Sequence, residues 1–259
     1  MSHNFQRSPG VVNLRLWENA ERASNYVAHQ IAELIIAQQK IGESAVLGLA
    51  TGNTPKAVYQ ELVRLHRHDG LSFANVVSFN LDEYYPILPG DKNSYNYFMH
   101  EHLFKHIDIA PENIHIPQGN CATDAVSELC SDYEAKIAGV GGLDLQLLGI
   151  GRNGHVGFNE PGSTLDSTTR LVELHPVTRN DAQADFGSLD RVPVQAISMG
   201  MATIIQAKRI LLLALGERKS EIINKAINGA ITPEVPGSML RHLPHVEYVV
   251  DREAGAGVL

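Results

Sequence analysis

The chain has 259 residues, of which 44% are hydrophobic and 19% charged, and it carries a formal net charge of −8. This composition is typical of a folded globular protein, and the acidic balance excludes broad nucleic-acid binding, which needs a basic surface. The two cysteines, Cys121 and Cys130, are too few for a disulfide framework and form no CxxC pair, so we expect both thiols to be reduced.

From the amino terminus onward, apolar residues either recur at helical spacing or form short continuous runs, which are typical of strands buried on both faces. In chain order we predict a helix over 16–40, a strand over 45–50, a helix over 56–67, a strand over 76–81, a helix over 94–106, a helix over 124–137 with Thr123 as its N-cap, a strand over 143–150, a strand over 210–215, a helix over 217–228 and a strand over 247–250. The segment 162–194 is polar and without a regular pattern, so we expect an irregular excursion or lid there.

Strands that alternate with helices indicate right-handed βαβ units. We therefore expect an α/β fold with a doubly wound, mainly parallel sheet and helices on both faces, similar to a Rossmann fold, in a single domain over residues 1–259. Ligands bind beyond the carboxyl ends of the strands in such sheets. Three loops that follow strands, 51–54, 82–85 and 151–160, should therefore meet at one site.

No segment is expected to lie in a membrane. The first ten residues, MSHNFQRSPG, contain no apolar run and are not expected to be a signal peptide. The longest apolar stretch, Ile210–Leu215, is far too short for a membrane span. We therefore expect a cytoplasmic protein with neither a membrane nor a nucleic acid as its partner.

The first loop, Thr51–Thr54, leads into a helix whose first residue is expected to be Pro55. Free backbone N–H groups at a helix start suit a phosphate, Gly52 allows a close approach, and Thr51, Asn53 and Thr54 add polar side chains. A nucleotide P-loop is excluded because the GxxxxGK[ST] spacing is absent. A plain capped turn is an equally good interpretation of this loop by itself.

Two further positions favour a charged ligand or a proton transfer. Asp82 and Glu83 come just past a strand end, where a carboxylate can act as a general base, although a solvated acidic turn is the slightly better interpretation of this pair alone. Lys219 lies at a predicted helix start, where its charge opposes the helix dipole, and this mismatch indicates an anionic ligand. A solvated surface lysine is the common alternative.

The segment 149–162, GIGRNGHVGFNEPG, contains the GxGxxG pattern of dinucleotide-binding loops after a predicted strand. We reject dinucleotide binding because such a loop opens a long helix, which Pro161 and Gly162 would break. Glycines such as Gly151 and Gly154 instead let the backbone pass close to a ligand.

His155 lies in this loop, with Asn153 two residues before it and Glu160 five residues after it. Imidazole is suited to proton transfer near neutral pH, and a neighbouring carboxylate can orient it. A lone histidine would more often be structural, but beside Glu160 and the glycines we favour a catalytic one. His102 and His106 also share a predicted helix face, but HExxH is not matched, so we expect no metal.

Taken together, these segments resemble the glucosamine-6-phosphate deaminase/isomerase family over about residues 13–251. The matching strings are LGLATGNTP, FNLDEYY, NSYNYFMHEHLF, LQLLGIGRNGHVGFNEPGS, and LALGERK followed by VPGSML. The related 6-phosphogluconolactonases share the fold and the Gly-His loop, but FNEPG favours the amino-sugar branch.

The resemblance implies a hydrolase and aldose–ketose isomerase that converts D-glucosamine 6-phosphate to D-fructose 6-phosphate and ammonia in N-acetylglucosamine catabolism, without a cofactor. A galactosamine-6-phosphate deaminase/isomerase and a 6-phosphogluconolactonase stay open as alternatives. A non-catalytic sugar-phosphate sensor is disfavoured because no basic extension is seen. Family members range from monomers to hexamers, so a homo-oligomer also stays open.

The resemblance also implies a role for each matched position. Asp82 corresponds to the base that moves a proton between C2 and C1, and His155 to the residue that assists opening of the sugar ring. Glu160 and Asn153 correspond to the partners of that histidine. The 51–54 loop and Lys219 correspond to phosphate contacts, and Gly151 and Gly154 belong to the substrate-binding loop.

The chain departs from the family pattern at the phosphate and effector sites. An arginine that binds phosphate in an NARFF-like string is missing, because DAQADFG places Ala184 near that position. We expect Arg179 to take its place. Val172 stands where regulated members have an effector-site lysine, so we expect no activation by N-acetylglucosamine 6-phosphate.

Overall fold

The computed structural model of the chain describes residues 12–258. The ten amino-terminal residues, for which we expect no signal peptide, and both ends of the predicted 1–259 domain lie outside them. Within the described part, no helix is both long and apolar enough to cross a bilayer. Cys121 and Cys130 are both free thiols.

Seven parallel strands form the main sheet, in the order β1-β10-β9-β6-β2-β3-β5. Their bounds are β1 (Leu14–Trp17), β2 (Ala45–Leu49), β3 (Val76–Asn80), β5 (Ile114–His115), β6 (Leu145–Leu148), β9 (Ile210–Ala214) and β10 (Val246–Asp251). Every residue of β2, β3, β6 and β9 is buried, as continuous apolar runs predict for strands covered on both faces.

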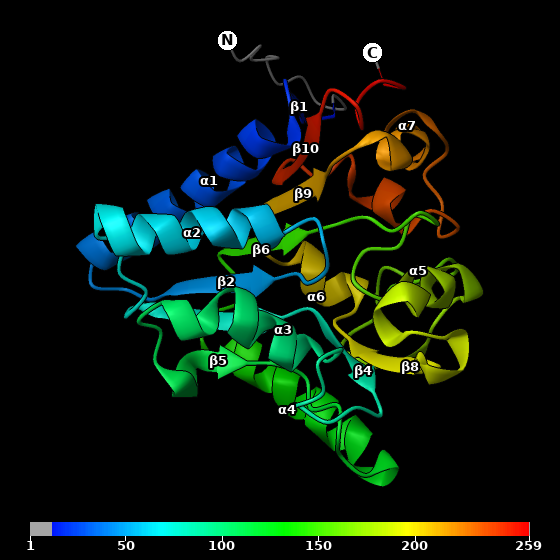
Figure 1. Ribbon diagram of the computed structural model, residues 1–259, viewed down its shortest axis with the longest axis horizontal. Coiled ribbons are helices and arrows are strands. Elements are labelled where there is room, and N and C mark those ends of the chain that lie inside the picture. The colour runs from blue at the N-terminus through cyan, green and yellow to red at the C-terminus, as the bar shows by residue number, and fades with distance from the viewer. Residues whose placement is uncertain (1–11, 259) are drawn as a thin grey trace.

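Helices supply the rest of the core, and most of them pack on this sheet. Their bounds are α1 (Ala20–Lys40), α2 (Lys56–Asp69), α3 (Tyr95–His102), α4 (Val126–Gly139), α5 (Pro176–Phe186), α6 (Met201–Ile205) and α7 (Ser220–Asn228). Figure 1 shows α1 and α2 side by side along the sheet. On α4, the ring of Tyr133 meets Phe79 of β3 edge-on at 5.6 Å. The expected α/β fold with a mainly parallel sheet is confirmed.

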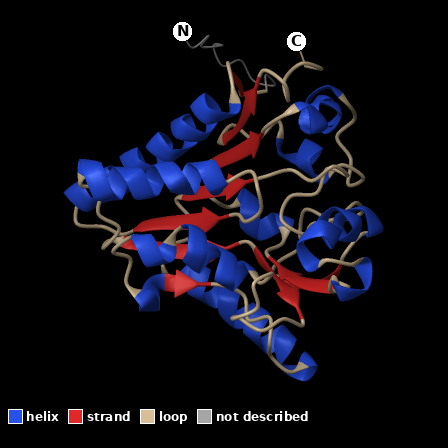
Figure 2. Ribbon diagram, viewed as in Figure 1, coloured by secondary structure: helices blue, strands red, loops and turns tan. Residues whose placement is uncertain are grey.

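A second, antiparallel sheet has the order β4-β8-β7 and lies beside the carboxyl end of the main sheet (Figure 2). Its strands are β4 (Asp82–Tyr85), β7 (Arg170–Glu173) and β8 (Gln195–Ser198). Our prediction of a loop at 82–85 is therefore wrong, and so is an irregular 162–194, which contains β7 and α5. Leu81 alone separates β3 from β4, and β4 becomes a strand by pairing with β8, more than 100 residues later.

The helix predicted from 217 begins at Ser220, after a 3₁₀ turn, and two other predicted helix starts also differ from the structure. The helix expected from Leu16 begins at Ala20, because the Asn19 side chain accepts the Arg22 N–H, while Leu14–Trp17 pairs with β10 as β1. Thr123 is not an N-cap, because its hydroxyl hydrogen-bonds the Tyr85 hydroxyl at 3.0 Å. In both cases a residue that the local pattern assigns to a helix start instead contacts a part of the chain that is distant in sequence.

Candidate active site

A cavity of about 480 Å³ lies at the carboxyl ends of four strands of the main sheet. The cavity is lined by residues 50–54 after β2, 81–82 after β3, 149–152 after β6, and 215, 218 and 219 after β9. Helix α5 closes one side with Thr178, Asp181, Ala182 and Asp185. The structure thus brings the three predicted loops together with the predicted Lys219, and it adds a helix that the sequence pattern did not predict.

Asp82, the first residue of β4, is 5% exposed and lines the cavity. Burial first, and the negative charge of Glu83 second, raise the pKa of Asp82 to about 8. No described residue forms a hydrogen bond with its carboxyl oxygens, so this group can meet a ligand with both oxygens.

The Glu83 side chain does not line the cavity, and its contacts are with backbone N–H groups. Its carboxylate accepts the backbone N–H groups of Tyr84, Tyr95 and Asn96 at 2.8–2.9 Å, which ties β4 to the first turn of α3. Burial raises the pKa of Glu83 to about 7, although these three N–H groups act in the opposite direction. Of the two adjacent carboxyl groups, only that of Asp82 lines the cavity.

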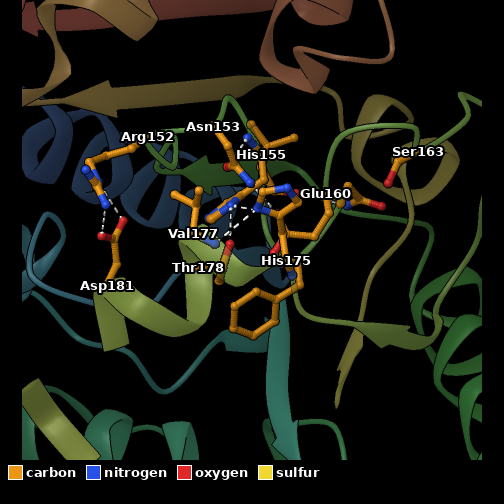
Figure 3. A network of polar contacts seen from close by, with 12 residues as sticks. Arg152, Asn153, His155, Glu160, Ser163, His175, Val177, Thr178 and Asp181 are labelled. Atoms are coloured by element: carbon orange, nitrogen blue, oxygen red, sulfur yellow. Dashed lines mark hydrogen bonds and ion pairs between the residues drawn. The ribbon is translucent and has the colours of Figure 1, made fainter. Parts of the chain in front are cut away.

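His155 lines the cavity, and Figure 3 shows the Glu160 side chain beside its imidazole ring. Its Nδ1 lies 3.2 Å from Glu160 Oε2 and 3.2 Å from the Thr178 hydroxyl. Asn153 donates its side-chain amide to the same Glu160 oxygen at 2.7 Å and accepts the His155 backbone N–H at 3.3 Å. Because Nδ1 faces a carboxylate, it carries the proton in the neutral ring, and Nε2, which has no hydrogen-bond partner among residues 12–258, is available as an acceptor.

The charge of Glu160 is stabilised by these contacts. Burial alone would raise its pKa, but the hydrogen bond and charge of His155, together with hydrogen bonds from Thr178 and Asn153, lower it to about 2. The second oxygen of Glu160 accepts the His175 backbone N–H at 3.2 Å, at the start of α5. Glu160 is therefore an anion at neutral pH and does not itself line the cavity.

Two glycines of this loop are required by close packing. A Cβ atom on Gly151 would lie 2.3–2.5 Å from the His155 ring, so any side chain there would displace the imidazole. Gly154 has a φ of +88°, and a Cβ atom there would lie 2.8 Å from the Val235 side chain. Gly151 lines the cavity, whereas Gly154, which the resemblance assigned to the substrate-binding loop, is absent from its lining.

The 51–54 loop and Lys219 line the same cavity. Lys219 ends a short 3₁₀ turn before α7, and its ammonium group donates to the Ile150 carbonyl at 2.7 Å. Burial lowers the pKa of Lys219. This ammonium group is fixed on the cavity wall and has donors left for an anion.

Arg179 does not lie with the other predicted residues. Its guanidinium donates to the carbonyls of Leu189 and Val192, each at 3.1 Å, and it is absent from the cavity lining. The expectation that it occupies the place of the missing arginine finds no support in this geometry. Arg152 and Arg218 are the arginines that line the cavity.

Sequence reasoning missed several other residues of the cavity. Tyr84 and Tyr95 line it beside Asp82, with ring centroids 4.9 Å apart, and Thr178 and Asp181 reach it from α5. FNLDEYY contains Tyr84, so its position after Asp82 was a usable signal. The α5 residues gave none, because α5 was not predicted.

The histidines considered as metal ligands have other partners. His106 contacts Arg67 at 2.7 Å and the Glu101 carbonyl at 3.0 Å, and His102 packs on Phe98. Among residues 12–258, no three His, Cys, Asp or Glu side chains are grouped as metal ligands would be.

The amino-acid sequence of this chain is similar to a known family of proteins. The family described as "Glucosamine-6-phosphate isomerases/6-phosphogluconolactonase" matches residues 18–247. A glucosamine-6-phosphate deaminase of Bacillus velezensis is 45% identical over 246 residues, which cover 95% of this chain and 100% of that protein. A putative glucosamine-6-phosphate deaminase-like protein of Bacteroides thetaiotaomicron is 43% identical over 239 residues, which are 92% of this chain but only 36% of that longer protein.

Solved structures give the same grouping. A monomeric glucosamine-6-phosphate deaminase matches with a TM-score of 0.90 at 41% identity, covering 95% of this chain and 99% of that one. A 6-phosphogluconolactonase from Trypanosoma brucei matches with a TM-score of 0.76 at 19% identity, covering 97% of this chain and 100% of that one. The second match reflects the fold alone.

Proposed function

This chain belongs to the glucosamine-6-phosphate isomerase/6-phosphogluconolactonase family, and from that premise we propose that it is a glucosamine-6-phosphate deaminase, which converts D-glucosamine 6-phosphate to D-fructose 6-phosphate and ammonia. The observation that carries this proposal is the pair of groups in one cavity: a buried carboxyl, Asp82, and a histidine, His155, held by an anionic Glu160. Such a pair suits ring opening followed by proton transfer next to a carbonyl.

Ring opening is the task of His155 in this proposal. With Nδ1 hydrogen-bonded to Glu160, Nε2 can take the proton of the sugar O1 hydroxyl and return it to O5, which exposes the aldehyde. Glu160 stabilises the imidazolium formed in between. Asn153 and Thr178 position this pair through their contacts with Glu160 and His155.

Asp82 then moves a proton between two carbons. Its carboxylate takes the C2 proton to give an enolamine and delivers it to C1, and water releases ammonia from the resulting C2 imine. A carboxyl with a pKa of about 8 is a stronger base than an ordinary one, once it is ionised. The cationic amino group of the substrate favours that ionisation.

The phosphate lies at the other end of the substrate in this proposal. The 51–54 loop and the ammonium group of Lys219 bind it, and this remote binding orients C1 and C2 toward the reacting groups. We propose that the chain forms one domain, which contains the whole site. The enzyme is expected in the cytoplasm, because phosphorylated sugars do not cross membranes freely. Val172 supports the further expectation that N-acetylglucosamine 6-phosphate does not activate the enzyme.

A coupled assay tests the proposal. The purified protein should release ammonia from glucosamine 6-phosphate, faster than from galactosamine 6-phosphate, and should release no acid from 6-phosphogluconolactone. Asp82→Asn should abolish ammonia release while binding of the substrate is retained in a calorimetric titration. Acid release from the lactone without ammonia release would show a lactonase instead, and full activity of the Asn variant would remove Asp82 from its role.

A further inference from the structure

Three basic side chains line the cavity together with His155: Arg152, Arg218 and Lys219. The whole chain has a net charge of −8, so an anionic ligand depends on this local group of cations. Arg152 stands apart from the other two because it follows Gly151 directly and lies three residues before His155. It therefore belongs to the same loop as the histidine.

The guanidinium of Arg152 is paired with an acidic side chain of α5. Its Nε donates to Asp181 Oδ2 at 2.9 Å, and its Nη2 donates to Asp181 Oδ1. Figure 3 shows this pair beside the group formed by His155, Glu160 and Thr178 and separate from it. Both partners line the cavity, and both are close enough to Lys219 for their charges to act on its pKa, Asp181 raising it and Arg152 lowering it.

The Arg152–Asp181 pair is exposed and therefore exchangeable. The side chains are 52% and 42% exposed, and ion pairs of this kind stabilise a protein by only about 0–1 kcal/mol. A phosphate dianion has the same bidentate geometry as a carboxylate and more charge, so the guanidinium binds it more strongly. Before a phosphate binds, Asp181 holds the guanidinium at the cavity wall.

We propose that Arg152 binds the phosphate of the substrate together with Lys219, and that the phosphate displaces Asp181 from the guanidinium. The identity of the ligand as a sugar phosphate rests on the proposed function. Asp181 then competes with the substrate for the guanidinium. Removing Arg152 should therefore weaken substrate binding, whereas removing the charge of Asp181 should strengthen it.

Kinetics of two variants test this inference. Arg152→Gln should raise KM for glucosamine 6-phosphate roughly tenfold to a hundredfold, the loss expected for one charge-assisted contact, with little change in kcat. Asp181→Asn should lower KM roughly twofold to fivefold, because it removes an exposed ion pair that competes with the phosphate. A purely structural ion pair would shift KM in the same direction in both variants.

The chain offers a matched control pair on α2. Arg64 contacts Glu61 and Asp69 in exposed ion pairs outside the cavity. Arg64→Gln and Asp69→Asn should leave KM at the wild-type value. Thermal unfolding of all four variants checks that they fold.

A calorimetric titration with inorganic phosphate separates this inference from the proposed function. Arg152→Gln should weaken phosphate binding, and Asp181→Asn should strengthen it, whether or not the protein turns over glucosamine 6-phosphate. If the wild type releases no ammonia but this binding pattern appears, the proposed function fails and the inference stands. If ammonia is released and Arg152→Gln changes neither KM nor phosphate binding, the inference is overturned.

Discussion

Asp82 and Glu160 are both buried carboxyl groups, yet their pKa values move in opposite directions. Burial raises that of Asp82 to about 8, and the contacts of Glu160 with His155, Thr178 and Asn153 lower its pKa to about 2. The difference follows from hydrogen bonding, since Glu160 accepts several donors and Asp82 accepts none from the described residues. One group is therefore a permanent anion and the other a base that exchanges its proton.

The raised pKa of Asp82 makes the stability of the protein depend on pH. The pKa rises from 3.8 to about 8 on folding, so the native state keeps a proton that the unfolded state loses within this window. The free energy of unfolding should therefore fall as the pH rises from about 4 to about 8. Asp82→Asn removes this penalty and should stabilise the protein on the order of a few kcal/mol at pH 9, and much less at pH 4.

Urea unfolding of the wild type and Asp82→Asn at pH 4, 6 and 9 measures this difference. Asp69→Asn is the control, since Asp69 is exposed on α2. An equal effect of Asp82→Asn at every pH would contradict the assignment of the raised pKa to Asp82.

At the level of secondary structure, α5 connects the segment 162–194 to the site. Thr178 contacts His155 and Asp181 contacts Arg152, so both come from the cavity side of this helix. Arg179, the next residue after Thr178, instead binds the carbonyls of Leu189 and Val192 beyond the helix end. Some residues of this helix thus contribute to the cavity, and others attach the helix to the segment that follows it.

Arg179 should accordingly act on stability rather than on binding. Arg179→Gln removes two hydrogen bonds to backbone carbonyls and should lower the free energy of unfolding by roughly 1–3 kcal/mol. The KM for glucosamine 6-phosphate should stay near the wild-type value at temperatures where the variant is folded. Arg22→Gln, which breaks an exposed ion pair on α1, is the control.

If Arg179→Gln raised KM as much as is expected for Arg152→Gln, without a loss of stability, Arg179 would instead be a phosphate-binding residue. Thermal unfolding and ammonia-release kinetics on the same preparations distinguish the two outcomes.

In the molecule as a whole, the polar network that joins β1, α1, β9 and β10 is separate from the polar network of the cavity. Glu247 of β10 is 5% exposed and accepts hydrogen bonds from Arg15 of β1, Tyr26 of α1 and Arg209 just before β9. Burial alone would raise the pKa of Glu247, but these donors lower it. This network fastens the edge strand and the first helix to the sheet and lies outside the cavity.

Glu247→Gln should therefore destabilise the protein without changing its chemistry. The loss should be roughly 1–3 kcal/mol, because the carboxylate is buried while its two arginine partners are partly exposed to solvent. Urea unfolding measures this loss, and an unchanged KM for glucosamine 6-phosphate shows that the site is intact. Glu18→Gln, which removes the exposed ion pair with Arg22 of α1, should be close to neutral. A stable variant with an altered KM would show that the two networks are coupled.

Features of this protein that depend on local patterns could be predicted from the amino-acid sequence. Buried parallel strands are continuous apolar runs, so β2, β3, β6 and β9 were predictable, and polar segments after them marked the loops that meet at the cavity. His155 and Glu160 were predictable as a pair because they are only five residues apart.

Contacts between residues that are far apart in the chain could not be predicted in this way, because they depend on how the elements pack. Strand β4 exists because β8 pairs with it, and Thr178 reaches His155 because α5 packs over the loop. Arg179 and Arg152 are both basic residues near the predicted site in sequence. The backbone carbonyls at 189 and 192 hold the first away from the cavity, and Asp181 holds the second at its wall, because side-chain direction is set by partners that local sequence does not specify.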